Sequence, residues 1–101
     1  MKNKKNLEIN WNMQKMFLVF YYTKHGIKNL PFETVEDFAD FLSMTEKGLG
    51  MWEANFRYLM GKKKRTLEHF SKEQSYIFCK YANMGRKEME EKALYYIEEN
   101  S

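Results

Sequence analysis

The chain has 101 residues, of which 44% are hydrophobic, 17% aromatic and 31% charged, with a net charge of +3. This length corresponds to one globular domain, and the composition excludes a disordered chain. The sequence has no apolar window long enough to cross a membrane, no cleavage site after its longest apolar run, and one cysteine, which excludes a disulfide framework. We therefore expect one cytoplasmic domain over residues 9–101, after a flexible basic segment over residues 1–8.

The first predicted element is a helix over residues 10–25. Asn10 is a suitable N-cap, and Gly26 stands just beyond the helix end. Apolar side chains cover this helix nearly all round: Met13, Met16, Phe17, Leu18, Val19, Phe20, Tyr21 and Tyr22. Such a helix is usually central to a core or covered by a partner on its second face.

Two further helices follow a connector over residues 26–33. The second begins at Thr34 and ends near Ser43, and the third runs from Thr45 to about Met60, with Gly61 closing it. Both contain an apolar stripe at helical spacing. The stripes are Val35, Phe38, Ala39, Phe41 and Leu42 in the second helix, and Leu49, Trp52, Phe56 and Leu59 in the third.

The last two predicted helices span residues 71–82 and 86–100. Ser71 and Gln74 form a capping-box pair for the fourth helix, and Cys79 lies beside aromatic residues, where we expect it to pack. Strand signals are weak, so the sequence predicts an all-α fold of about five helices. Any strand is confined to residues 58–70, where Lys62–Arg65 could be the tip of a short β-wing or a loop. The predicted buried faces are Gln74, Ile77, Phe78 and Tyr81, then Met89, Ala93, Tyr96 and Ile97.

The second and third helices fit the spacing of a helix-turn-helix. This motif needs a small residue where the helices cross, and Ala39 stands there between the apolar residues Phe38 and Leu42. Four residues after the alanine, the turn holds Ser43, where a glycine is common. Leu49 and Trp52 occupy the positions that the second helix of the motif buries, although helical hairpins that do not bind DNA can share this pattern.

A resemblance to a known family covers about residues 34–60. The residues that carry it are Ala39-Asp40-Phe41-Leu42-Ser43-Met44-Thr45, then Leu49-Gly50-Met51 and Asn55-Phe56. This stretch resembles the small helical domain found ahead of HNH nuclease modules in some bacterial restriction-like proteins. The resemblance implies a DNA-associated helix-turn-helix without catalytic activity, because His25 and His69 lie in no nuclease-like cluster. The chain looks like a stand-alone form of that domain, of the kind that phages and mobile plasmids carry.

Charges are segregated along the middle of the chain. Residues 33–53 contain six acids and one lysine, and that face should repel a phosphate backbone. Residues 57–65 contain five bases and no acid, which is either a DNA-contacting wing or a solvated turn. The candidate DNA-binding residues are Thr45, Lys47, Gly48, Met51, Arg57, Lys62, Lys63, Lys64 and Arg65.

Gly48 and Gly50 lie within the third predicted helix, where each costs about 0.5–1 kcal/mol relative to alanine. Two explanations are open: close approach of a ligand such as DNA, or close packing under Phe38 or Trp52. Asn55, on the same helix, is expected to be internal and to bond a neighbouring backbone group.

The sequence predicts no enzyme, cofactor or metal site. His25 and His69 are far apart and lack cysteine partners, and no glycine-rich phosphate loop follows a strand. The leading hypothesis is a homodimeric helix-turn-helix protein that binds double-stranded DNA for a mobile element, in transcriptional regulation or DNA processing. The alternative is a phage-type inhibitor or adaptor that binds a protein partner through its acidic helical face.

Overall fold

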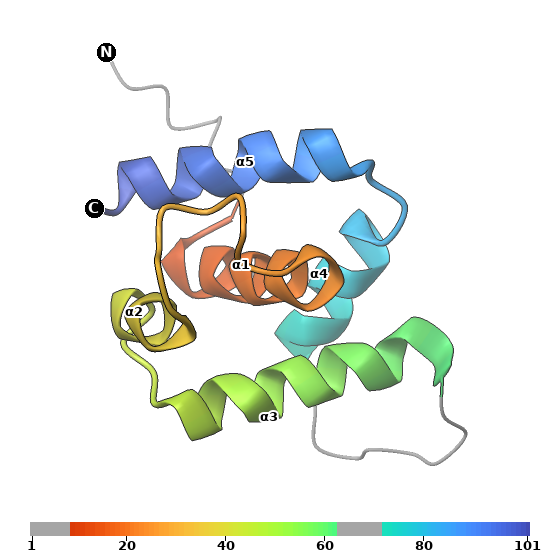
Figure 1. Cartoon of the computed structure of the whole chain (residues 1–101). Helices are drawn as coiled ribbons and strands as arrows, with labels where there is room; N and C mark the ends of the chain where they lie inside the picture. Colours follow the sequence, from red (N-terminus) through yellow and green to blue (C-terminus); the bar gives the residue numbers. More distant parts are fainter. Residues whose placement is uncertain (1–8, 63–71) are drawn as a thin grey trace.

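A computed structural model describes residues 9–62 and 72–101, and this part of the chain is all-α (Figure 1). Its five α-helices confirm the predicted fold class, and none of them is long and apolar enough to cross a membrane. The elements are α1 (Trp11–His25), α2 (Val35–Phe41), α3 (Glu46–Arg57), the π-helix η2 (Tyr58–Lys62), α4 (Lys72–Tyr81) and α5 (Arg86–Glu99).

The helix starts follow from capping chemistry that is visible in the sequence. Asn10, Thr34 and Thr45 are the N-caps of α1, α2 and α3, as predicted. Each side-chain oxygen accepts a hydrogen bond from a backbone N–H that would otherwise lack a helical partner. The donors are Met13 at 3.0 Å, Asp37 at 3.0 Å and Gly48 at 2.9 Å.

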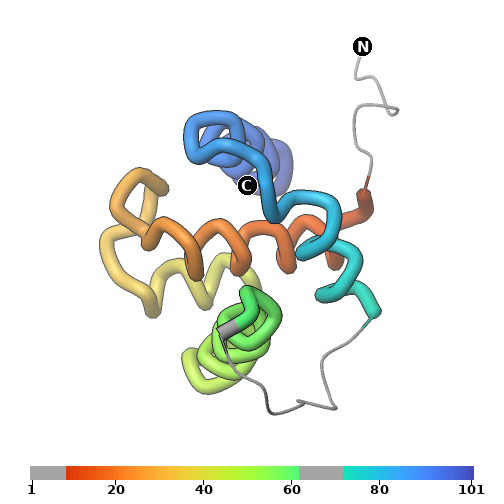
Figure 2. The backbone as a smooth tube through the Cα atoms, turned by 90° about the vertical axis from the view of Figure 1, so that its right-hand side faces the viewer, coloured from red at the N-terminus to blue at the C-terminus, as the bar shows by residue number. Residues whose placement is uncertain are grey.

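Helix α1 is the centre of the molecule, which explains why its sequence is apolar nearly all round. Figure 2 shows α1 running across the view, with α5 on one side and α3 on the other. It packs against α3, α4 and α5. Five consecutive residues of α1, 17–21, have no exposed surface, so all sides of the helix are covered within the chain.

Aromatic rings make the main contacts between α1 and the helices around it. Phe20 stacks on Phe56 of α3, with ring centroids 4.9 Å apart. Phe17 meets Tyr81 of α4 at 4.8 Å and Tyr96 of α5 at 5.5 Å, in both cases edge to face. Such pairs add about 0.5–1.5 kcal/mol beyond the area that they bury. The core is therefore built from a few large rings, as a short aromatic-rich chain requires.

Two buried glutamines join helices through their amides. Gln14 of α1 donates to the Ile9 carbonyl at 2.8 Å and accepts from the Asn100 side chain at 2.8 Å. Gln74 of α4 accepts from Asn55 at 3.2 Å and donates to a backbone carbonyl of α3. Asn55 is thus half-buried and internal, as predicted, although its partner is a side chain rather than the backbone.

Two local predictions need correction, whereas the predicted end of the third helix is close to the structure. Helical backbone continues past α3 through the π-helix Tyr58–Lys62 to Gly61, which has a φ of 84°, and the tip of the possible wing lies outside the described residues. Cys79 is exposed, because it lies on the side of α4 opposite to the buried Ile77. Trp52 is only half-buried, whereas Leu49 and Phe56 on the same face of α3 are fully buried.

His25 is the last residue of α1 and contributes a buried polar atom. Its Nε2 atom is buried and finds no hydrogen-bond partner in the described part of the chain, and its ring lies 5.1 Å from that of Tyr21. Burial, followed by the positive charges of Lys24 and Arg86, lowers the pKa of His25, and Glu90 opposes the shift. The fold therefore favours the neutral imidazole.

We expect this histidine to make the protein less stable in mild acid. The pKa of His25 is below 6.5 in the folded chain, so the unfolded chain binds the proton more readily. The free energy of unfolding should be highest above about pH 6.5 and should fall as the pH decreases toward the folded pKa, by less than about 1.4 kcal/mol per pH unit. Urea titrations at several pH values measure this decrease. The variant His25→Gln should lose it, and an unchanged slope in that variant would contradict the assignment.

Candidate nucleic-acid interface

The link between α2 and α3 is a tight turn centred on Ser43. Ser43 has a φ of 60°, and it is the sole non-glycine residue with positive φ in the described ranges. Its N–H donates to the Asp40 carbonyl at 2.9 Å, and the N–H of Met44 donates to the Ala39 carbonyl at 2.9 Å. This bonding pattern is a Schellman motif, which normally places glycine at the left-handed position. The serine therefore performs the role that the helix-turn-helix pattern assigns to a glycine.

The two helices cross where the sequence has its small residue. Ala39 is 1% exposed, and Phe38 and Leu42 beside it are fully buried. In Figure 1, α2 is seen nearly end-on while α3 lies across the page, so the two axes cross steeply. Met44 and Trp52 are partly buried against the same core. The α2–turn–α3 unit thus places a small buried residue beside a tight turn between two helices that cross steeply.

The face of α3 opposite its buried side carries four exposed residues. They are spaced three, one and three residues apart along the helix, and this spacing places them on one face. Met51 is the most prominent, with 61% of its surface exposed. The four exposed residues, called the α3 face below, are Lys47, Gly50, Met51 and Ala54.

The two glycines of α3 have different surroundings in the structure. A Cβ atom added to Gly50 meets no described atom within 4 Å, so helix packing does not require a glycine there. A Cβ atom added to Gly48 would lie 3.2 Å from the Thr45 hydroxyl oxygen, which is a tight contact beside the N-cap. The close-packing explanation therefore fails for Gly50. The other explanation, close approach of a ligand, stays a prediction for that residue.

We expect Gly50→Ala to stabilise the fold by about 0.5–1 kcal/mol, because alanine fits the space and restricts the unfolded backbone. Gly61→Ala is the matched control, since its φ of 84° disfavours any side chain, and that variant should be less stable than the parent. Urea unfolding of both variants measures the two changes. A destabilised Gly50→Ala variant would show that the glycine is needed within the fold.

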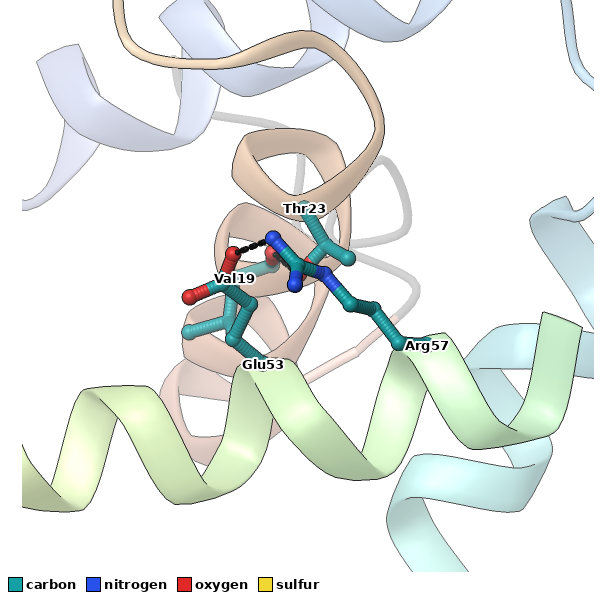
Figure 3. Close-up of polar contacts among 4 residues, drawn as sticks. All are labelled: Val19, Thr23, Glu53 and Arg57. Carbon is teal, nitrogen blue, oxygen red and sulfur yellow. Dashed lines mark hydrogen bonds and ion pairs between the residues drawn. The ribbon is translucent and has the colours of Figure 1, made fainter. Parts of the chain in front are cut away.

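Of the nine predicted binding residues, Lys47 and Met51 lie together on the α3 face, and three others lie beside it. Thr45 caps α3, and Gly48 is half-buried next to it. Arg57 is exposed and pairs with Glu53 at 2.6 Å. Figure 3 shows this pair reaching from α3 toward α1 next to Thr23. The predicted binding residues did not include Gly50 and Ala54, although the spacing from Lys47 places both on this side of the helix.

The remaining predicted residues form the basic run after α3. Lys62 ends η2, and Lys63, Lys64 and Arg65 lie outside the described residues, as does the Lys62 side chain. Their contribution to the interface is therefore still a prediction from the sequence. No group of three or more His, Cys, Asp or Glu side chains is placed to hold a metal ion within residues 9–62 and 72–101.

Acidic residues surround the start of both helices of the unit. Glu36 and Asp37 lie in the first turn of α2, and Glu46 lies in the first turn of α3. Carboxylates at these places interact favourably with the helix dipole, typically by about 0.3–1 kcal/mol. Part of the acidity thus has a structural reason. Asp40, exposed on the last turn of α2, has no such role.

Comparison of the chain with protein-family models, with curated proteins and with solved structures finds no significant match.

Proposed function

We propose that this chain is a small, non-enzymatic DNA-binding protein in which α2 and α3 act as a helix-turn-helix. The observation that supports this proposal best is the α3 face, which combines one lysine, a large exposed Met51 and a glycine that packing does not require. In this motif the second helix enters the major groove, and its exposed residues face the base edges. The Ser43 turn and the steep crossing of α2 and α3 also support this proposal.

Most of the electrostatic affinity must come from the bases of residues 57–65, because the α2–α3 unit before them is acidic. Lys47 is the single base among residues 33–53, which also contain six acids. The five bases of residues 57–65 follow directly in the sequence. Each phosphate that such a base neutralises adds about 0.9 to the slope of log affinity against log salt. We therefore assign phosphate contacts to the basic run and base contacts to the α3 face.

A salt titration tests the proposal. The parent chain is mixed with fluorescent random-sequence duplexes, and anisotropy is measured between about 50 and 200 mM salt. We expect binding with a steep salt slope. Gly50→Ala should fold more stably yet bind more weakly, because its new methyl group stands between the helix backbone and the groove. If the parent binds no duplex even at the lowest salt, the proposal fails.

We further propose that the protein binds as a homodimer, since paired helix-turn-helix units contact two half-sites. Burial of α1 on all sides removes one sequence-based reason for a dimer. The remaining structural reason to expect a dimer is the apolar surface of α5, where Leu94 is 36% exposed and Tyr95 is half-buried beside it. Sedimentation of the parent and of Leu94→Glu tests this proposal: the parent should be a dimer and the variant a monomer.

A second candidate function is supported by the exposed acids of α2. Glu36, Asp37 and Asp40 are all exposed, on the same unit that would have to approach phosphates. A protein inhibitor or adaptor could use these carboxylates to dock on a basic groove of its partner. The double variant Glu36→Lys, Asp40→Lys distinguishes the two functions. It should bind duplex more tightly if DNA is the ligand, whereas a partner held through the acids would be released.

A further inference from the structure

The α3 face holds one side chain, Lys47, of the kinds that usually read bases by paired hydrogen bonds. Arginine and lysine read guanine in this way, and asparagine and glutamine read adenine. Asn55 of α3 is half-buried and donates to Gln74 at 3.2 Å, so its amide serves the core. Arg57 pairs with Glu53 at 2.6 Å. Lys47 is then the one cationic donor on the α3 face, and the rest of that face is small or apolar.

Met51 is the side chain that projects from this face. Three large hydrophobic residues are exposed in the described ranges, and Met51 at 61% exceeds Tyr76 at 46% and Leu94 at 36%. Gly50 and Ala54, its neighbours on the same face, are too short to reach beyond the helix backbone. An unbranched thioether is flexible and polarizable, and adapts well to an uneven apolar surface. If α3 lies in a groove, Met51 reaches its floor before its neighbours do.

The major groove presents one apolar group, the C5-methyl of thymine. We infer that Met51 is a specificity-determining residue of this interface and that it contacts thymine methyl groups, so that the protein prefers thymine-containing steps. This inference rests on the proposed DNA-binding function. Gly50 and Ala54 contribute by letting the α3 backbone lie close to the base edges, which brings the Met51 side chain within contact distance of the methyl.

Replacing thymine by uracil tests this inference, because uracil keeps the hydrogen-bonding edge and the charge of the DNA and lacks the methyl group. Two A·T-rich duplexes of one sequence are compared by anisotropy at the same salt concentration, one with thymine and one with uracil. Burial of one methyl group corresponds to about a fourfold gain in affinity. We expect the parent to bind the thymine duplex at least about fourfold more tightly. Met51→Ala should bind the two duplexes equally.

A control variant separates this contact from general effects of uracil on DNA. Tyr76→Ala removes a different exposed hydrophobic side chain, on α4, and should keep the full preference for thymine. If the parent binds both duplexes equally well, or if Met51→Ala keeps the preference, the inference is wrong while the DNA-binding function stands. If the parent binds neither duplex, the proposed function fails and the inference fails with it.

Discussion

Phe56→Ala should lower the free energy of unfolding by about 3–5 kcal/mol, the usual loss when a buried aromatic is truncated in a packed core. Phe56 has no exposed surface, and its ring stacks on Phe20 of the central helix at 4.9 Å. Its removal leaves a cavity between α1 and α3 where the two rings stack. Since small domains have total stabilities of about 5–15 kcal/mol, this variant should be close to unfolding at room temperature. Urea titration followed by circular dichroism measures the loss.

Trp52→Ala is the informative comparison for this prediction. Trp52 lies four residues before Phe56 on the same side of α3, yet it is only half-buried. Its truncation should therefore cost clearly less than that of Phe56, because much of the ring already contacts water. An equal loss in the two variants would mean that α3 is rotated about its axis relative to the arrangement described above.

Much of the fold could be predicted from the sequence because helices depend on local signals. Asn10, Thr34 and Thr45 cap the three helices at which the sequence places them. The all-round apolar character of α1 indicated a central helix, and the structure places it there. The errors occur where tertiary contacts decide. Trp52 matches the buried periodicity, but it lies at the edge of the core, and spacing alone does not reveal how far a core extends.

The candidate site was predictable only in part. Helical spacing correctly places Lys47 and Met51 on the outer side of α3. It does not reveal that Arg57 pairs with Glu53, because an i, i+4 pair forms only when rotamers and neighbours allow it. The two explanations for Gly50 likewise could not be separated without knowing what surrounds the helix. Periodicity indicates the direction of a side chain, whereas its partners depend on rotamers and on the elements packed around the helix.

Lys63→Ala with Lys64→Ala should weaken binding to every duplex sequence alike. Each lysine that neutralises a phosphate contributes about 0.9 to the salt slope, so the double variant should lower the slope by up to about 2. Linear extrapolation of that relation gives a loss of about 60-fold at 0.1 M salt. The effect is large because residues 33–53 contain one lysine against six acids, and Arg57 at the end of α3 pairs with Glu53, so the α2–α3 unit offers little other attraction for phosphates.

The matched control is Lys28→Ala with Lys87→Ala, which removes the same charge from two exposed positions outside the α2–α3 unit. This control should keep most of the slope, since charges far from the duplex are screened over about 10 Å at 0.1 M salt. Lys47→Ala should behave in a third way and change the preference among sequences, because its side chain lies on the α3 face with Met51. If the two double variants lose affinity equally, the basic run is a solvated turn and overall charge attracts the DNA. If instead the Lys63 and Lys64 variant binds as the parent does, phosphate contacts must come from other cations, and the acidic face of α2 becomes the stronger guide to a partner.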